Sequence, residues 1–99
     1  MDNQYYFANT RTYKVGATDK AMKSGNGYIV ADNKYELCRY LSDYIHGVRI
    51  STIDMIKKAE NMSDVRDIIN HHDLTISKLD AMIAEVKQLD KNRGRGMDF

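Results

Sequence analysis

Hydrophobic residues between Ser63 and Leu89 recur mainly at steps of three and four, and no other part of the chain is as strongly patterned. This spacing puts them on one side of an α-helix with 3.6 residues per turn, whereas the opposite side is charged and polar. The hydrophobic stripe consists of Val65, Ile68, Ile69, Ile76, Leu79, Met82, Ile83, Val86 and Leu89. A helix over this stretch would be roughly 40 Å long. It cannot bury its stripe alone, so another element or another chain must cover it.

The pattern predicts a long amphipathic helix over residues 63–90. Ser63 is a suitable N-cap, and Asp64 in the first turn favours the positive end of the helix dipole. Residues 72–75 would fit an interruption, but the hydrophobic spacing continues across them. We therefore expect one uninterrupted helix.

A second helical segment is expected at residues 32–60, where Leu37, Leu41 and Ile45 form a hydrophobic face and Asp32 or Asn33 is the N-cap. Gly47 fits the left-handed residue that commonly ends a helix, and the hydrophobic phase changes after it. We expect a break or kink there. The alternative is one helix over residues 34–60, in which Gly47 costs about 1 kcal/mol relative to alanine. The short connection at residues 61–63 predicts an antiparallel hairpin.

The first 31 residues show shorter patterns that are typical of strands and turns. Residues 11–15 and 28–31 are rich in strand-forming side chains, and residues 24–27, with the sequence Ser-Gly-Asn-Gly, predict a turn. We expect 11–15 and 28–31 to pair as a small antiparallel sheet, with a short helix at residues 17–23. The aromatic residues Tyr5, Tyr6 and Phe7 fit either an edge strand or an arm that docks on another surface.

These elements predict an α+β, predominantly helical fold, in which a small N-terminal β element precedes an antiparallel helical hairpin. A chain of 99 residues is expected to form a single domain. We place that domain at residues 1–90, with a β-rich, aromatic and basic arm at 1–31, a helical segment at 32–60 and the long helix at 63–90. Residues 91–99, which include Arg93 and Arg95, are expected to be a flexible basic tail.

The formal net charge of +1 argues against a domain that binds polyanions over its whole surface. The charges are nevertheless segregated, since residues 1–31 contain four basic and two acidic side chains, whereas residues 61–90 contain three basic and six acidic ones. Cys38 is the single cysteine, so no intramolecular disulfide can form. The chain has no hydrophobic run long enough to span a membrane, and its first residues do not resemble a signal peptide. We therefore expect a cytoplasmic protein.

The sequence offers little for catalysis or metal binding. His46, His71, His72, Cys38 and Asp73 are the available ligands, but they do not follow the spacing of a known metal motif. Cys38 lies on a predicted helix, and nothing in the sequence identifies a base that would activate it. We therefore expect a non-enzymatic protein without a metal or a cofactor.

The N-terminal third combines aromatic side chains, which stack on nucleotide bases, with basic side chains, which hold phosphates. The turn at residues 24–27 is glycine-rich, so backbone amides can approach an anion, although the P-loop pattern is absent. The alternative interpretation is that these aromatic residues pack on the helices and the lysines are simply solvated. The predicted ligand-binding residues are Tyr5, Tyr6, Arg11, Tyr13, Lys14, Lys20 and Lys23.

A helix-turn-helix reading of residues 65–83 is less well supported. Lys78 is the one basic residue in the supposed recognition helix, and the acidic balance of the segment opposes docking on phosphates. Binding of nucleic acid as an accessory or regulatory protein is therefore an alternative function.

The hydrophobic stripe predicts a homo-oligomer, dimeric or higher, because a two-helix hairpin would leave part of it exposed. The alternative is that the N-terminal β element covers the stripe in a monomer. The expected function is a small cytosolic protein that binds or sequesters a partner, either a protein or a phosphorylated nucleotide ligand. A further alternative is an inhibitor of a host protein, of the kind that phages encode. The predicted oligomer interface consists of Val65, Ile69, Ile76, Leu79, Met82, Ile83 and Val86.

Overall fold

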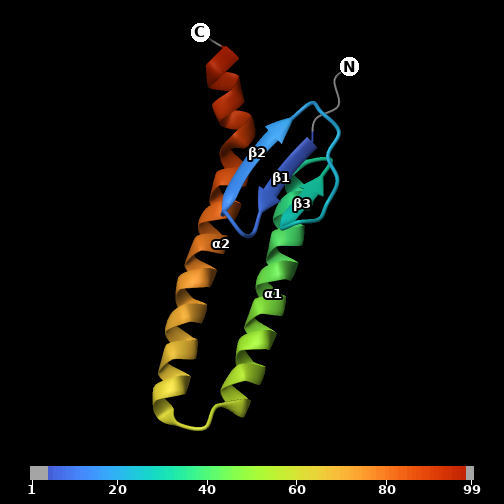
Figure 1. The fold of residues 1–99 in the computed structure, drawn as a ribbon. Helices are drawn as coiled ribbons and strands as arrows, with labels where there is room; N and C mark the ends of the chain where they lie inside the picture. Colours follow the sequence, from blue (N-terminus) through green and yellow to red (C-terminus); the bar gives the residue numbers. More distant parts are fainter. Residues whose placement is uncertain (1–4, 98–99) are drawn as a thin grey trace.

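A three-stranded sheet lies against one end of a long helical hairpin in the computed structural model (Figure 1). The structure describes the backbone of residues 5–97 and the side chains of residues 5–89. The strands are β1 (Tyr5–Asn9), β2 (Lys14–Thr18) and β3 (Tyr28–Ala31), and the helices are α1 (Lys34–Lys58) and α2 (Met62–Met97). This arrangement confirms the predicted α+β, mainly helical fold and the helical hairpin.

The sheet is antiparallel with the order β2-β1-β3, so the aromatic N-terminal segment is the central strand and not an edge or a free arm. The predicted pairing of residues 11–15 with 28–31 is wrong, because β2 begins at Lys14 and both outer strands pair with β1. The predicted helix at 17–23 is also wrong, since β2 continues to Thr18 and a loop follows. β1 forms backbone hydrogen bonds with both outer strands, so these strands do not pair with each other. Pairing with β1 also keeps residues up to Thr18 extended, where a helix was predicted.

Helix α1 runs without a break through Gly47, so the expected break is wrong. A methyl group at Gly47 would meet nothing within 4 Å, which shows that this residue faces open space and serves no turn. Ile45 is buried just before it, and Val48 packs against the core just after it, so the helix is held on both sides. The Asn33 side chain caps α1 by accepting a hydrogen bond from the backbone N–H of Glu36 at 2.8 Å.

Helix α2 passes through residues 72–75 without interruption, as predicted, and extends to Met97, beyond the expected end at residue 90. Its N-cap is Asn61 and not Ser63, because the Asn61 side chain accepts a hydrogen bond from the backbone N–H of Asp64 at 2.9 Å. Within the described part of the chain, neither helix is long and hydrophobic enough to cross a membrane.

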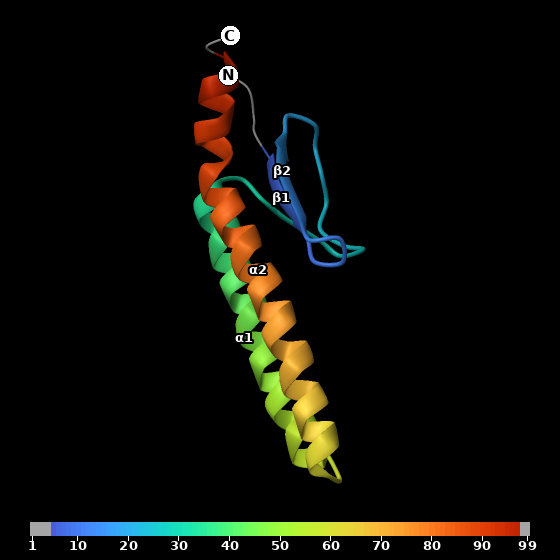
Figure 2. The same cartoon turned by 90° about the vertical axis from the view of Figure 1, so that its left-hand side faces the viewer.

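The hydrophobic core lies where the sheet covers the upper part of the hairpin (Figure 2). Each element contributes residues at its own spacing: alternate residues of the strands and every third or fourth residue of the helices. The stripe of α2 is therefore covered by the sheet over its upper half, as the alternative interpretation of the sequence proposed. The buried hydrophobic residues are Tyr6, Ala8, Ala31, Leu37, Leu41, Ile45, Ile76, Leu79, Met82 and Val86.

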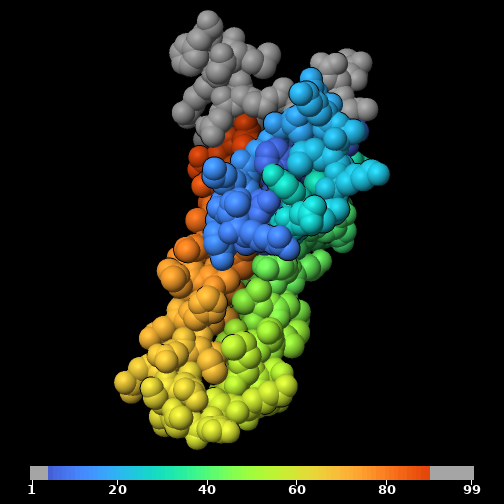
Figure 3. Space-filling view, in the orientation of Figure 1, coloured from blue at the N-terminus to red at the C-terminus, as the bar shows by residue number. Residues whose placement is uncertain are grey.

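The lower half of the hairpin, residues 46–75, projects beyond the sheet, and we call it the helical arm. The space-filling view shows this half standing free of the strands (Figure 3). No residue of the helical arm is buried. Several of its large hydrophobic side chains are instead exposed to solvent: Ile50, Ile53, Met55, Met62, Ile69 and Leu74.

Candidate functional site

The sheet has an outer face that points away from the helices. Residues directly opposite each other in an antiparallel pair share a face. Since Tyr6, Ala8 and Ala31 are buried against the helices, their neighbours along each strand lie on the outer side. This outer sheet face consists of Tyr5, Phe7, Lys14, Gly16, Thr18, Tyr28 and Val30, together with Asn9, whose side chain is used within the turn that follows β1.

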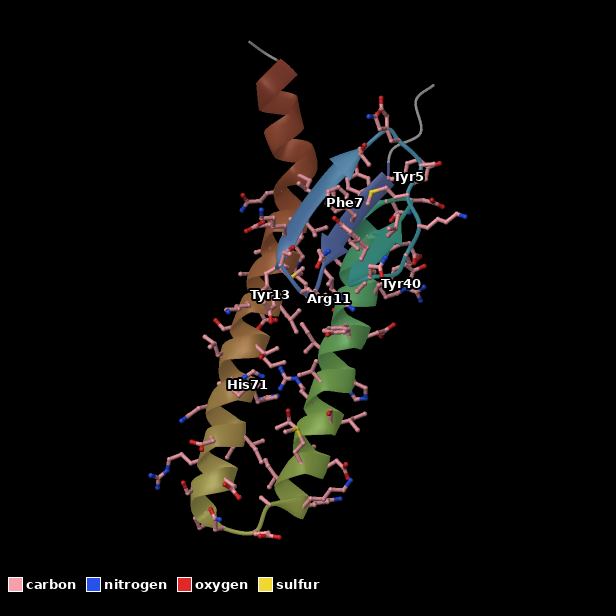
Figure 4. All side chains as sticks on the ribbon, in the orientation of Figure 1. Tyr5, Phe7, Arg11, Tyr13, Tyr40 and His71 are labelled. Atoms are coloured by element: carbon pink, nitrogen blue, oxygen red, sulfur yellow. The ribbon has the colours of Figure 1, made fainter. Side chains whose placement is uncertain are left out.

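Phe7 stands at the centre of the outer sheet face. Gly16 lies opposite it on β2, and a methyl group built there would approach Phe7 Cζ to 2.6 Å, so the ring covers this glycine. On the other side, the rings of Phe7 and Tyr28 meet edge to face, with centroids 5.9 Å apart. Tyr5 lies on the same strand and the same face (Figure 4). Three aromatic rings from two strands therefore share one surface.

The turn between β1 and β2 is organised by Asn9. Its buried side-chain oxygen accepts hydrogen bonds from the backbone N–H groups of Arg11 at 2.9 Å and Thr12 at 3.1 Å. Tyr13 adopts a positive φ of 62°, and its N–H donates to the Asn9 carbonyl at 2.8 Å. This turn fixes Arg11 and Tyr13 at the rim of the sheet that is nearest to the helical arm (Figure 4).

Arg11 lies against the loop that joins β2 to β3. A methyl group at Gly27 would come within 2.9 Å of Arg11 Cγ, and Gly27 has a φ of +88°, so two separate constraints favour glycine there. The backbone N–H of Thr10 also donates to the Gly27 carbonyl at 2.8 Å. The aliphatic part of the Arg11 side chain is therefore held beside the sheet.

The loop at residues 19–27 contains Lys20 and Lys23, and it runs on the side of the sheet that faces away from the helices (Figure 2). Its end is the tight turn that the sequence predicted. Gly25 and Tyr28 exchange backbone hydrogen bonds of 3.0 and 2.8 Å, and the two residues between them have positive φ. Both lysines are exposed.

The surface around the sheet is basic. Residues 5–31 contain four basic side chains, Arg11, Lys14, Lys20 and Lys23, and one acidic side chain, Asp19. Within the part of the chain whose side chains are described, none of the four cations forms an ion pair. Their charges are therefore available to an anionic ligand.

Two of the predicted ligand-binding tyrosines, Tyr6 and Tyr13, pack in or beside the core and not on the outer sheet face. Tyr6 is 7% exposed and belongs to the core, so its ring is not available for stacking. Tyr13 is half-buried and packs beside the core, with Lys78 Nζ 5.0 Å from the centre of its ring. Phe7 and Tyr28 were not among the residues predicted to bind a ligand. Strand alternation is the signal that would have found Phe7, because Tyr5 and Phe7, not Tyr5 and Tyr6, share a face.

The predicted oligomer interface also needs correction. Ile76, Leu79, Met82 and Val86 are buried in the chain's own core beneath the sheet, so they are not available to a second chain. Val65 and Ile83 are half-buried, and Ile69 is 41% exposed. The correction follows from the sheet, which covers the upper half of the stripe.

The histidines and the cysteine lie away from the sheet surface. Burial raises the pKa of the Cys38 thiol above its ordinary value, and the nearby charges of Lys87 and Lys34 offset part of that effect. His72 Nδ1 is 3.3 Å from Asp73 Oδ1, whereas its buried Nε2 has no hydrogen-bond partner in the described chain. Across the described residues, no three side chains of His, Cys, Asp or Glu are grouped so that they would hold a metal ion.

No protein-family model matches this chain, and comparison with curated proteins and with solved structures gave no significant match.

Proposed function

We propose that this protein is a non-enzymatic binding protein whose outer sheet face holds a phosphorylated nucleotide, either free or within a single strand. The observation that supports the proposal is the combination of Tyr5, Phe7 and Tyr28 on one sheet surface with four cations around it that form no ion pair with the described residues. A nucleotide carries both of the matching groups, a flat base and an anionic phosphate.

The aromatic rings would contribute stacking. Tyr28 is 38% exposed, and Tyr5 and Phe7 are half-buried, so each ring keeps some surface for a base. Base stacking on an aromatic side chain is worth about 1–3 kcal/mol per base, and it tolerates different bases. The edge-to-face contact between Phe7 and Tyr28 holds these rings in place before a ligand arrives.

The cations would hold the phosphate. Lys14 lies on the outer sheet face itself, and Arg11 lies at its rim, where the β1–β2 turn and Gly27 fix its position. An arginine that is already positioned loses less side-chain freedom when it binds an oxyanion. Lys20 and Lys23 on the adjoining loop add positive charge that attracts the same ligand.

The chemistry of the face supports binding and sequestration. The residues assigned to it offer aromatic, hydroxyl and amine groups but no carboxylate, imidazole or thiol. We also propose that the protein is cytoplasmic, which its single cysteine fits. Finally, we propose that it is a homo-oligomer, because the helical arm exposes hydrophobic side chains and buries none.

The test is calorimetric titration with two probes, adenosine monophosphate and a thymidylate decamer, at several salt concentrations. A steep loss of affinity for the decamer with salt, and weak binding of the monophosphate, would identify single strands as the ligand. The reverse order would identify free nucleotides. Arg11→Ala combined with Lys14→Ala should weaken binding at least tenfold.

Lys57→Ala combined with Lys58→Ala is the matched control, because it removes two exposed cations from the far end of α1. This control should bind as the parent protein does. Absence of binding to both probes, or equal losses in the two double variants, would contradict the proposal.

A further inference from the structure

The helical hairpin has a face that the sheet does not touch. A groove of about 520 Å³ lies between the two helices at the level of the core, yet no strand residue borders it. The strands pack against the opposite side of the helical turns that line the groove. We call the side on which the groove opens the sheet-free face. Its lining residues are Tyr35, Glu36, Cys38, Arg39, Ser42, Ile83 and Lys87.

The sheet-free face continues along the helical arm. Residues separated by eleven or eighteen positions lie on nearly the same side of a helix. On α1, Ile53 lies eleven residues after Ser42, and on α2, Ile69 lies eighteen residues before Lys87. Met62 and Ile69 line a single small pocket, so they belong to the same surface. The groove and the exposed side of the arm therefore form one face.

The lower end of this face exposes three large hydrophobic side chains. Ile53 is 54% exposed, Met62 is 74% exposed and Ile69 is 41% exposed. Because no residue of the helical arm is buried, two helices alone do not provide the arm with a core. Helices in proteins owe most of their stability to packing of a hydrophobic face, so this face is expected to be covered in solution.

The charges of the helical arm indicate what covers it. Residues 46–58 of α1 carry three basic side chains and one acidic one, whereas residues 62–75 of α2 carry one basic side chain and three acidic ones. Arg49 and Asp73 lie at the same level of the hairpin, because the residues that precede them, Val48 and His72, line one pocket. Arg49 lies four residues before Ile53, and Asp73 lies four residues after Ile69. Residues four apart are neighbours on one side of a helix, so both charges lie on the sheet-free face. The surface is therefore complementary to itself when α1 meets α2.

We propose that two copies of this chain pack back to back through their sheet-free faces, with α1 of one copy against α2 of the other. The product is an antiparallel four-helix bundle that carries the two sheets on its outside. Arg49 of each copy then meets Asp73 of the other, so the two-fold axis provides two such contacts. This inference rests on the proposed homo-oligomer and adds its surface and its symmetry.

The available area is sufficient for a dimer. Two adjacent helices are about 20 Å wide, and residues 35–58 span about 36 Å, so each copy offers roughly 700 Å². Stable protein interfaces bury about 600–1,000 Å² per partner, so this area falls within their range. The groove between Tyr35 and Lys87 lies within this area and would receive side chains of the second copy.

The first experiment measures the mass of the full chain in solution by sedimentation equilibrium. The parent protein should have about twice the 11.4 kDa of one chain. Ile53→Glu combined with Ile69→Glu should give a folded monomer, because both side chains are exposed within the single chain. The control is Leu74→Glu, which is 58% exposed but lies five residues from Ile69 and so on another side of α2. This control should remain a dimer.

The second experiment tests whether the partner is another copy. Arg49→Glu and Asp73→Arg should each weaken the dimer at least tenfold, because like charges then meet across the interface. An equimolar mixture of the two variants should recover the dimer, since each copy supplies the charge that the other lost at one of the two contacts. Only self-association predicts that recovery.

Each outcome decides between the proposals. A parent protein that remains monomeric contradicts both the homo-oligomer and this interface. If the oligomer survives the double variant Ile53→Glu and Ile69→Glu, or if Leu74→Glu dissociates it, the protein is a homo-oligomer but the sheet-free face is not its interface. Failure of the charge-swapped mixture to recover overturns the pairing of α1 with α2.

Discussion

The ring of Phe7 occupies the space that a side chain at Gly16 would need, since a methyl group built there would lie 2.6 Å from Phe7 Cζ. Glycine inside a strand usually weakens it, but it also allows a close approach that no other residue permits. Here the approach lets the Phe7 ring cover Gly16 on β2 while it contacts the Tyr28 ring of β3 edge to face. The middle of the proposed binding surface therefore depends on a residue that has no side chain.

Gly16→Ala should displace the Phe7 ring from the outer sheet face. We expect a loss of about 1 kcal/mol in the free energy of unfolding, because the added methyl group overpacks the contact, together with weaker nucleotide binding. Urea denaturation and calorimetric titration measure the two effects. Gly47→Ala is the control, since nothing lies within 4 Å of the new methyl group. It should raise stability by about 1 kcal/mol. Equal effects at both sites would contradict the packing of Phe7 on Gly16.

Leu79→Asp should unfold the chain. Leu79 is fully buried between the sheet and the hairpin, so the substitution places a carboxylate in the core without a partner. A loss of about 3–5 kcal/mol is comparable with the whole stability of a small domain. Circular dichroism at increasing temperature measures it. Leu74→Asp, at a position 58% exposed, should change stability by less than about 0.5 kcal/mol. A folded Leu79→Asp protein would show that the core lies elsewhere.

His72→Leu should stabilise the protein. The buried Nε2 of His72 has no hydrogen-bond partner among the described residues, so its desolvation is not compensated. Replacing it with a hydrophobic side chain should raise the free energy of unfolding by about 1 kcal/mol. Thermal and urea denaturation would measure the change, and His71→Leu at the exposed neighbouring position should have no such effect. A less stable His72→Leu variant would indicate that the contact between His72 Nδ1 and Asp73 contributes more than the unpartnered Nε2 costs.

The Cys38 thiol should react slowly with iodoacetamide at neutral pH. Burial raises its pKa above the ordinary value of 9.0, and the thiolate is the reactive form. The rate of alkylation should therefore have its midpoint above pH 9.0 in the folded chain and at the ordinary value after denaturation. Because the unfolded thiol ionises first, the free energy of unfolding falls as the pH rises through this range. A midpoint below the ordinary value would contradict the burial of Cys38.

The helices could be predicted from the sequence because long hydrophobic periodicity reports a face directly. The stripe from Val65 to Leu89 predicted α2, and it continued through residues 72–75 as the structure confirms. Gly47 misled the prediction because glycine is typical of helix ends, whereas here the buried Ile45 and the core contact of Val48 keep the helix intact. Local propensity was outweighed by tertiary packing.

The sheet was harder to predict because strand pairing depends on distant contacts. β1 precedes both of its neighbours, so its central position does not follow from the order of turns along the chain. Among the proposed site residues, Arg11 and Lys14 lie at or beside the outer sheet face, but Tyr6 points into the core. The adjacency of Tyr5 and Tyr6 concealed the alternation that decides which ring faces solvent.

The attachment of the sheet to one end of the hairpin divides the chain into parts of unequal local stability. Amide hydrogens in the strands and in the upper turns of the helices should exchange with solvent only when the core opens, whereas those of residues 46–75 should exchange through fraying of the hairpin tip. Self-association through the sheet-free face would hold the tip closed. Amide exchange in the helical arm should then slow as the protein concentration rises, while exchange in the β1 strand stays constant.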